Sequence, residues 1–544
     1  MRHRKHRAGP DGVVEPGMLE RSSHGNREIS SLATGDGGPH REGEEPKPMK
    51  NGLEKSDRLI VAKKPANSAK GPALESVERR RRTKENTEDA CTHRTLSRAR
   101  VFPGLDRVRE RARREKKDRF TSLLHHVNVE LLEAAFSWLR RDAAPGADGM
   151  TWHEYEQDLT ERLRDLHERL HRGVYRPLPS RRKFIPKGSG LRPLGVAALE
   201  DKVVQRALVE VLNAIYETDF LGFSYGFRSG RSQHDALDAI AFGITRMRVN
   251  HVLDCDIRAF FDSLSHEWLI RFLEHRVGDP RVIRLIRGWL KAGVVVDGTL
   301  APSEAGTPQG AVISPLLANI YLHYCFDQWA ERWRQRDARG QVIFVRYADD
   351  IVAGFEHEED ARRFQADVHV RLERFALTLH PEKTRLLEFG RFAADNRAKR
   401  GVSRPETFDF LGFKHISGHS LAGYFQLKRK TRRDRMRATL QSVKEELRRR
   451  RHDPIPDQGR WLAQVVRGYF AYHAVPTNGR SLVAFRGDIK VLWMRALRKR
   501  SQKDRTSWLR MARLVADYLP KPKILHPWPA DRFLVKHPRW KPSA

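Results

Sequence analysis

Two short apolar runs on either side of a polar turn give the clearest pattern in the chain. Residues 342–345 (Val-Ile-Phe-Val) lead into residues 346–350 (Arg-Tyr-Ala-Asp-Asp), and residues 351–353 (Ile-Val-Ala) form the second run. The pattern predicts two buried strands joined by a turn that carries adjacent carboxylates. Such carboxylates repel each other, so a fold keeps them together mainly where cations neutralise them. The plain alternative is an exposed acidic hairpin turn.

Apolar residues at helical spacing predict helices around this hairpin. We expect a basic helical stretch over residues 105–120, followed by helical spacing over residues 123–132. Thr151 and Glu154 predict a capping box, and the helix that it opens should end at Gly173. Strands and helices then interleave to about residue 413, which indicates an α+β domain. Three helical stretches, over about 428–451, 461–473 and 482–500, predict a small bundle with one strongly basic face.

The net charge of the chain indicates the class of its binding partner. The chain has 103 Lys and Arg residues against 69 Asp and Glu residues, a formal net charge of +34, which favours polyanion binding. Cys91, Cys255 and Cys325 are scattered and form neither a disulfide framework nor a CxxC metal motif. No apolar run has the length of a membrane span, and the basic start lacks the apolar stretch of a secretory signal. These features predict a soluble intracellular protein that binds nucleic acid and no membrane.

Candidate metal ligands follow from a second strand. Residues 252–257 (Val-Leu-Asp-Cys-Asp-Ile) form an apolar strand that ends in carboxylates. Residues 347–350, Tyr-Ala-Asp-Asp between apolar strands, closely resemble the reverse-transcriptase palm. That resemblance implies a cage of Asp256, Asp349 and Asp350 as catalytic residues, with Ile257 as a further metal-ligating position. The cage would hold two Mg²⁺ ions, one for the primer hydroxyl and one for the triphosphate. Asp254 is the runner-up to Asp256, and Asp262 is expected to be structural.

The resemblance also implies a set of nucleotide contacts. Phe261 would screen the sugar 2′ position, and Gln309 in the Gly-Thr-Pro-Gln-Gly loop of residues 306–310 would contact the nucleotide. Lys187 and Arg192, in the segment that resembles the fingers hairpin, would lie over the triphosphate. Lys383 would be the general acid for pyrophosphate departure. Core packing for Phe261 and a solvated turn for Lys187 and Arg192 are the alternatives.

From about residue 105 to 540 the chain resembles the reverse transcriptase and maturase that bacterial group II introns encode. The resemblance rests on residues 144–149 (Ala-Pro-Gly-Ala-Asp-Gly), residues 221–228 (Leu-Gly-Phe-Ser-Tyr-Gly-Phe-Arg) and residues 467–473 (Arg-Gly-Tyr-Phe-Ala-Tyr-His). It implies a right-hand polymerase with fingers and palm, followed by an all-α thumb or maturase domain. Its implied partners are group II intron RNA, an RNA template with a DNA primer, target DNA and deoxynucleoside triphosphates.

The expected domains follow from this resemblance and from composition. Residues 1–95 are a disordered basic leader, translated from upstream sequence if Met49 is the true start, or alternatively an RNA-binding arm. Residues 96–165 are a helical extension of the fingers, 166–416 the fingers and palm, 417–519 the thumb or maturase domain, and 520–544 a short basic tail. With no cysteine in that tail, the chain is expected to lack an HNH-type endonuclease and to take its primer from elsewhere.

Basic residues of the predicted bundle are the candidates for intron RNA binding. They are Arg449 and Arg450 in the cluster of residues 448–451, and Arg498, Lys499 and Arg500 near Lys503. A solvated helix face is the alternative. The expected location is the bacterial cytoplasm, at the nucleoid.

Three rival functions remain. The first is an intron-derived reverse transcriptase domesticated for defence or repair. The second is an RNA-binding splicing factor without polymerase activity, against which the intact aspartates argue. The third is a viral RNA-dependent RNA polymerase, which Tyr-Ala-Asp-Asp and Phe261 disfavour.

Overall fold

The structure is a computed structural model, and it describes residues 102–187, 190–296, 299–301, 305–307, 309–402, 404–501 and 506–536. It also leaves the side chains of residues 186–192 undescribed. The described part is a mixed α/β structure, as the sequence predicts. The predicted leader and Lys503 lie outside the described residues. No described helix is long and apolar enough to cross a membrane.

The predicted hairpin lies in a central antiparallel sheet. Its strands are β6 (Val342–Tyr347), β7 (Asp350–Phe355), β3 (His251–Asp256) and β8 (Arg385–Glu388), in the order β6-β7-β3-β8. Both faces of this sheet are buried, which explains why the strands are apolar without alternation. Ile343 packs on one face against helix α8 (Gln233–Arg246), whereas Phe344 packs on the other against Phe364 of α14 (Glu358–Glu373).

A second sheet is built around a long hairpin. It consists of β1 (Ser180–Lys187) and β2 (Gly190–Val196), extended by β4 (Val294–Val296) and β5 (Thr299–Ala301) in the order β2-β1-β4-β5. The other described helices up to residue 402 are α3 (Pro103–Arg114), the 3-10 turn η1 (Leu124–His126), α4 (Val129–Ser137), α5 (Trp152–Glu156), α6 (Leu159–Arg172), α7 (Leu199–Asp219), α9 (Phe260–Ser263), α10 (His266–Glu274), α11 (Pro280–Lys291), α12 (Ser314–Leu322), the π-helix η2 (His323–Asp327), α13 (Gln328–Arg336) and α15 (Ala393–Lys399).

The amino-terminal helices confirm the predicted caps and correct three helix bounds. Thr151 and Glu154 form the predicted capping box, but the helix that it opens, α5, ends at Glu156, and the separate helix α6 is the one that ends at Gly173, which has a φ of 76°. The helix expected over residues 105–120 ends at Arg114. The apolar pattern of residues 123–132 is divided between η1 and α4, because the Asn128 side chain caps α4 and accepts a hydrogen bond from the Leu131 amide at 2.9 Å.

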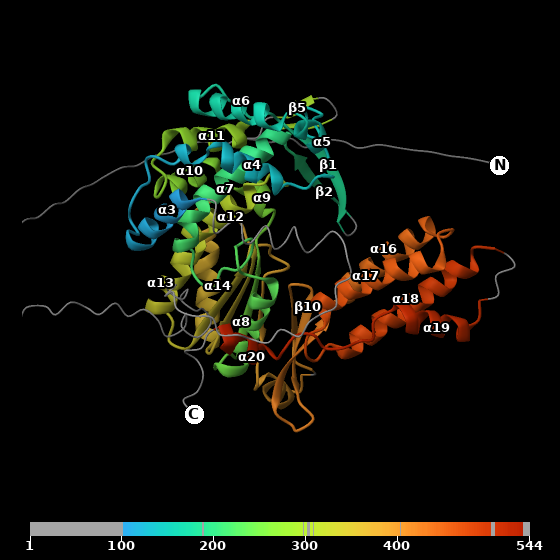
Figure 1. Cartoon of the computed structure of the whole chain (residues 1–544). Helices are drawn as coiled ribbons and strands as arrows, with labels where there is room; N and C mark the ends of the chain where they lie inside the picture. The colour runs from blue at the N-terminus through green and yellow to red at the C-terminus, as the bar shows by residue number, and fades with distance from the viewer. Residues whose placement is uncertain are drawn as a thin grey trace, which may run out of the picture. The chain divides into compact units, whose positions relative to one another are not determined.

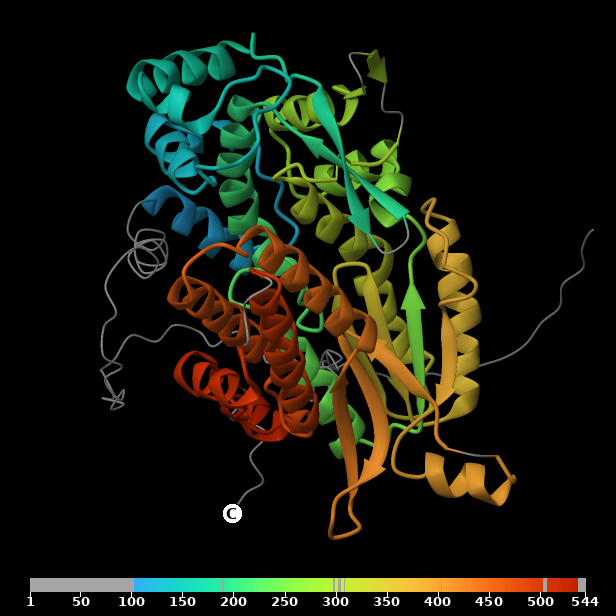
Figure 2. The same cartoon turned by 90° about the vertical axis from the view of Figure 1, so that its right-hand side faces the viewer.

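The chain continues into a third sheet and then a helical bundle. The sheet has the order β11-β10-β9, with β9 (Thr407–Phe410), β10 (Phe413–His419) and β11 (Phe425–Thr431). The bundle consists of α16 (Arg433–Arg449), α17 (Ile455–His473), α18 (Gly479–Arg498) and α19 (Trp508–Tyr518). Figure 2 shows the β10–β11 hairpin leading into α16. The helix predicted from about residue 428 therefore begins at Arg433, and strands extend past residue 416.

The last described element returns to the central sheet. Helix α20 (Pro529–Lys536) lies beside α8, as Figure 1 shows. The ring of Phe533 stacks on Phe242 with centroids 4.3 Å apart, and Arg532 forms an ion pair with Asp238. The segment expected to be a plain basic tail thus includes a docked helix. Its few apolar positions were too short a pattern to reveal it.

A buried guanidinium fixes the end of β6. Arg346 is 0% exposed and forms two hydrogen bonds of 2.6 Å with Asp327 of η2, which is equally buried. Nη2 also donates to the Ser224 hydroxyl at 2.7 Å, and Nη1 donates to the Asn319 side-chain oxygen and to the Ala348 carbonyl, both at 3.0 Å. Burial raises the pKa of Asp327, and the charge of Arg346 opposes that rise. The acidic turn is therefore held by one fully paired charge.

Replacing Asp327 with Asn should destabilise the protein strongly. The substitution keeps the shape of the side chain but leaves the Arg346 charge buried without a counter-charge, which costs about 3–5 kcal/mol. Urea unfolding followed by circular dichroism measures the loss. As a control, Glu358→Gln breaks the exposed Arg362–Glu358 pair of 2.6 Å and should cost less than about 1 kcal/mol. Equal losses in the two variants would contradict this account of the buried pair.

Candidate active site

The acidic turn is a tight two-residue connection. Tyr347 and Asp350 are cross-strand partners, so Ala348 and Asp349 alone join β6 to β7. Ala348 has a φ of 58°, a left-handed conformation that costs a non-glycine residue about 1–3 kcal/mol and needs support from its surroundings. The hydrogen bond from Arg346 to the Ala348 carbonyl supplies part of that support.

The register of the central sheet brings the predicted ligands to one edge. Asp256, the last residue of β3, is the cross-strand partner of Asp350, the first residue of β7, and Asp349 precedes it in the turn. Ile257 follows Asp256 directly and pairs with Leu379 in an isolated bridge. The structure therefore gathers Asp256, Asp349 and Asp350 from two segments that are far apart in the sequence.

Lys383 contacts this carboxylate edge. Its ammonium donates a hydrogen bond of 2.7 Å to Oδ2 of Asp256. The amide of His380 also donates to the Asp256 carbonyl at 2.7 Å, and this bond anchors the segment that carries Lys383. The predicted general acid thus lies beside a predicted metal ligand.

Crowded carboxylates make the edge suitable for cations. Burial raises the pKa of Asp254 to about 7, and the charges of Asp350 and Asp256 add to the rise while Arg385 opposes it. Oxygen donors of this kind are the ligands that Mg²⁺ prefers. Within the described ranges no three His, Cys, Asp or Glu side chains are drawn together closely enough to form a ready-made metal site. The three-aspartate cage therefore stays a prediction that the donor chemistry fits.

The two phenylalanines after β3 have different environments. Phe260 is buried in the core, whereas Phe261 is half-buried, with the ring centroids 5.3 Å apart. The loop of residues 306–310 lies against this segment, because the Thr307 amide donates to the Phe261 carbonyl at 2.8 Å. A Cβ on Gly306 would lie 2.9 Å from that same carbonyl oxygen, so glycine is needed for this approach. Phe260 is thus part of the core, whereas Phe261 packs against the core and stays partly exposed.

Gln309 connects the loop to two other segments. Its side-chain nitrogen donates to both carboxylate oxygens of Asp262 at 3.0 Å. Its backbone carbonyl accepts a hydrogen bond from the Gly195 amide at 2.6 Å. Asp262 is therefore a structural partner, in keeping with the sequence-based expectation. The side chains of Lys187 and Arg192 lie outside the described residues, although the backbone pairs Ile185 with Arg192 across the β1–β2 hairpin.

The predicted RNA-binding residues come together at one end of the bundle. Arg500 donates to the His452 carbonyl at 3.3 Å, which joins the two basic clusters that the sequence separates. Arg449 has an 80% exposed side chain, and Lys499 is also exposed. Arg450 is partly structural, since it pairs with Glu446 at 2.7 Å and lies over the Trp461 ring. Arg498 donates to the Thr506 carbonyl at 3.2 Å.

Sequence reasoning used residues 221–228 only as a family marker and missed their structural role. The Tyr225 amide donates to the Arg346 carbonyl, and the Arg346 amide donates to the Phe223 carbonyl, both at 2.8 Å. The Gly226 carbonyl accepts from the Asn319 side chain at 2.8 Å. Gly226 itself lies against the turn, where a Cβ would be 2.3 Å from the Ala348 nitrogen. The Ser-Tyr-Gly-Phe string of residues 224–227 was the sequence feature that could have indicated this role.

Comparisons with known proteins agree with this geometry. Residues 185–415 match the family model described as reverse transcriptase (RNA-dependent DNA polymerase). Protein YkfC of Escherichia coli is 36% identical over 256 residues, covering 41% of this chain and 66% of that protein. The group II intron-encoded protein LtrA of Lactococcus lactis is 33% identical over 224 residues, covering 40% of this chain and 37% of LtrA. Nuclear intron maturase 2 of Arabidopsis thaliana is 25% identical over 264 residues, covering 40% and 34%.

An antiparallel sheet that carries a Tyr-Ala-Asp-Asp turn opposite a third aspartate, within the matched region, defines a reverse transcriptase domain. The chain carries such a domain, and domains of this class generally use divalent metal ions. Its relatives include the group II intron-encoded protein LtrA and an intron maturase, of which the chain spans about a third of the length, and it spans 66% of YkfC.

Replacing Gly226 with Ala should impair catalysis more than folding. The added Cβ must displace the turn, and a shift of the aspartates by a fraction of an ångström should slow primer extension more than about tenfold. Single-turnover primer extension, with circular dichroism to verify the fold, measures the effect. As a control, Gly468→Ala places the same Cβ where nothing lies within 4 Å and should leave extension unchanged. A normal rate in the Gly226 variant would show that the turn tolerates movement.

Proposed function

We propose that this protein is an RNA-directed DNA polymerase that also binds and helps to splice a group II intron RNA. The observation that carries the proposal is the pairing of Asp256 with Asp350 across β3 and β7, next to a supported Tyr-Ala-Asp-Asp turn in a reverse transcriptase domain. Its substrates are deoxynucleoside triphosphates and an RNA template with a DNA primer. Target DNA at the insertion site is the further partner in retrohoming.

The proposed metal site uses Asp256, Asp349 and Asp350, with Ile257 as an additional ligating position. Two Mg²⁺ ions, when bound, activate the primer 3′-hydroxyl and stabilise the charge on the triphosphate. Before they bind, the ammonium of Lys383 partly neutralises Asp256. The same ammonium is the proposed donor of a proton to the departing pyrophosphate.

The loop and the fingers hairpin have proposed roles in selecting the nucleotide. Phe261 offers a partly exposed ring on α9, shortly after β3, which would collide with a sugar 2′-hydroxyl. Gln309 would contact the nucleotide from a loop already fixed to Asp262 and Gly195. Lys187 and Arg192 would lie over the triphosphate, where cations stabilise the leaving group.

The basic end of the helical bundle is the proposed intron RNA surface. Arg449, Lys499 and Arg500 gather there from two helices, on elements other than those that carry the aspartates. Clustered cations of this kind bind the phosphates of structured RNA. Reverse transcription and RNA binding would then use separate surfaces, and the protein would work in the bacterial cytoplasm, at the nucleoid.

A splicing factor without polymerase activity is the second candidate, favoured by the maturase among the relatives. Replacing Asp349 with Ala distinguishes the two candidates. Loss of a metal ligand should lower primer extension with Mg²⁺ by at least about a hundredfold, because it removes electrostatic stabilisation of the transition state. Binding of intron RNA should stay within a few fold of the wild type.

Primer extension on an RNA template measures this loss, and filter binding measures RNA affinity. As a control, Asp488→Ala removes an exposed carboxylate from α18 and should leave extension unchanged. No extension by the wild-type protein itself would favour the splicing factor. Normal extension by the Asp349 variant would refute the assignment of the catalytic aspartates.

Reversing the charge of Arg449 should weaken intron RNA binding and splicing more than primer extension. Each lost phosphate contact lowers the slope of log affinity against log salt by about 0.9 unit. Both Arg449 and Arg450 pair with Glu446, but Arg449 is the informative residue because its side chain is 80% exposed, whereas Arg450 also lies over the Trp461 ring. Affinity measured from 50 to 200 mM salt tests the slope, and Arg362→Glu, an exposed charge reversal on α14, is the control. An unchanged slope in the Arg449 variant would place the RNA surface elsewhere.

A further inference from the structure

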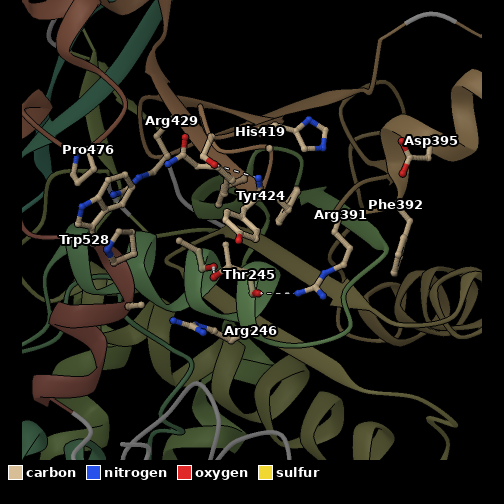
Figure 3. A pocket seen from close by; sticks show the side chains of 18 residues that line it. Thr245, Arg246, Arg391, Phe392, Asp395, His419, Tyr424, Arg429, Pro476 and Trp528 are labelled. Carbon is tan, nitrogen blue, oxygen red and sulfur yellow. Dashed lines mark hydrogen bonds between the residues drawn. The ribbon is translucent and has the colours of Figure 1, made fainter. Parts of the chain in front are cut away.

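A cavity of 790 Å³ lies outside the proposed catalytic and intron RNA surfaces. Its walls come from the end of α8, the start of α15 with the residues before it, the β10–β11 hairpin, and the start of α20 with the residue before it. Figure 3 shows Arg391, Tyr424 and Trp528 around it, on different segments of the chain. Its size falls within the range of about 300–1,000 Å³ that is typical of ligand pockets.

The strand register places this cavity at the opposite end of the central sheet from the aspartates. His251 at the start of β3 pairs with Glu388, and Arg391 follows that strand closely, whereas Asp256 at the end of β3 pairs with Asp350. A strand rises about 3.3 Å per residue, so the two ends of β3 are about 17 Å apart. The cavity is therefore not part of the polymerase site.

Cations dominate the rim of the cavity. Arg246 and Arg391 are both exposed, and the contact that Arg391 makes with the Thr245 carbonyl is long, at 3.4 Å. Among the residues that line the cavity in the described part of the chain, Asp395 is the one acidic side chain. The rim therefore carries an excess of positive charge, which suits a polyanion.

A buried guanidinium in the wall has an unused donor. Arg429 is 1% exposed, and its Nη1 is 3.5 Å from Asp238, a carboxylate that Arg532 also binds. Two guanidiniums thus share one carboxylate. The Nη2 atom of Arg429 is buried and has no hydrogen-bond partner among the described residues. Because Nη2 is enclosed, Arg429 acts on a ligand through its charge: two guanidiniums against one carboxylate leave an excess positive charge beneath the wall, which attracts an anion.

Exposed aromatic rings accompany these charges. Tyr424 is 76% exposed and Trp528 is 49% exposed, and Phe392 is also exposed, although large aromatic rings are usually covered. Rings interleaved with guanidiniums are the combination that binds single-stranded nucleic acid, because the rings stack on bases while the cations bind phosphates.

We propose that this cavity binds an unstacked nucleotide of a single-stranded RNA segment. The rings of Tyr424 and Trp528 would receive the base, Arg246 and Arg391 would bind phosphate oxygens, and the buried charge of Arg429 would add to their attraction. RNA is favoured over DNA because splayed bases are characteristic of RNA loops, and the Ser420 hydroxyl in the lining can hydrogen-bond a ribose 2′-hydroxyl. The site is separate from the polymerase function and does not depend on it.

Fluorescence anisotropy with the full chain tests the proposal. The probe is a labelled uridine-rich RNA of about 12 nucleotides, compared with DNA of the same sequence. Tyr424→Ala should weaken RNA binding roughly 5-fold or more through loss of stacking. Arg391→Gln should lower the salt slope by about 0.7 unit, the value for one phosphate contact to a single strand.

Lys430→Gln is the matched control for charge. Lys430 follows Arg429 on β11 but is exposed on the opposite side of the strand, so it should leave the slope unchanged. An equal effect of Lys430→Gln and Arg391→Gln would overturn the proposal, because it would indicate a general effect of net charge. Equal affinity for RNA and DNA would overturn the assignment to RNA.

Photocrosslinking locates the bound strand. A 4-thiouridine RNA should crosslink to peptides that contain Tyr424 or Trp528, and crosslinks found only on other peptides would overturn the proposal. Extension of a short primer-template by the Tyr424→Ala and Arg391→Gln variants should equal that of the wild type. This readout separates failure of the cavity proposal from failure of the polymerase proposal, which would remove extension from the wild type as well.

Discussion

The geometry of the acidic turn depends on the buried ion pair between Arg346 and Asp327. Both side chains are fully buried, and burial of charge is tolerated here because every contact is short and paired. The same guanidinium also holds Ser224, Asn319 and the Ala348 carbonyl. A single cation thus ties together the strand, the turn, the π-helix and the segment that precedes α8. Through the hydrogen bond to its carbonyl, this network helps Ala348 to keep its left-handed conformation.

The sequence predicted the strands of the central sheet but could not predict that network. The runs at residues 342–345 and 351–353 are apolar on both faces, so they were recognisable as strands buried on two sides. The partner of Arg346 lies in the five-residue π-helix η2, whose irregular turn breaks the periodicity that a sequence pattern depends on. No period in the sequence links an arginine inside an apolar strand to the carboxylate that pairs with it.

The error at residues 428–432 has a different physical cause. In β11 the buried positions Leu427, Arg429 and Thr431 alternate with Lys428 and Lys430, so the strand does have a period of two. The buried Arg429 concealed this period, because an arginine is expected at the surface. The basic run was therefore assigned to the helix that follows. At the candidate site the motifs identified the carboxylates and Lys383, while the contact of Gln309 with Asp262 required the fold.

The return of α20 to α8 has a mechanical consequence for the helical bundle. The chain enters the bundle through the short connection from β11 to α16 and leaves it through the segment that docks as α20. Phe533 and Arg532 fasten that exit to Phe242 and Asp238 of α8. A unit attached at both ends can rotate about the line through its two attachments but cannot swing freely about one of them. The docked helix therefore restricts the bundle to rotation about one axis, which passes through the β11–α16 connection and α20.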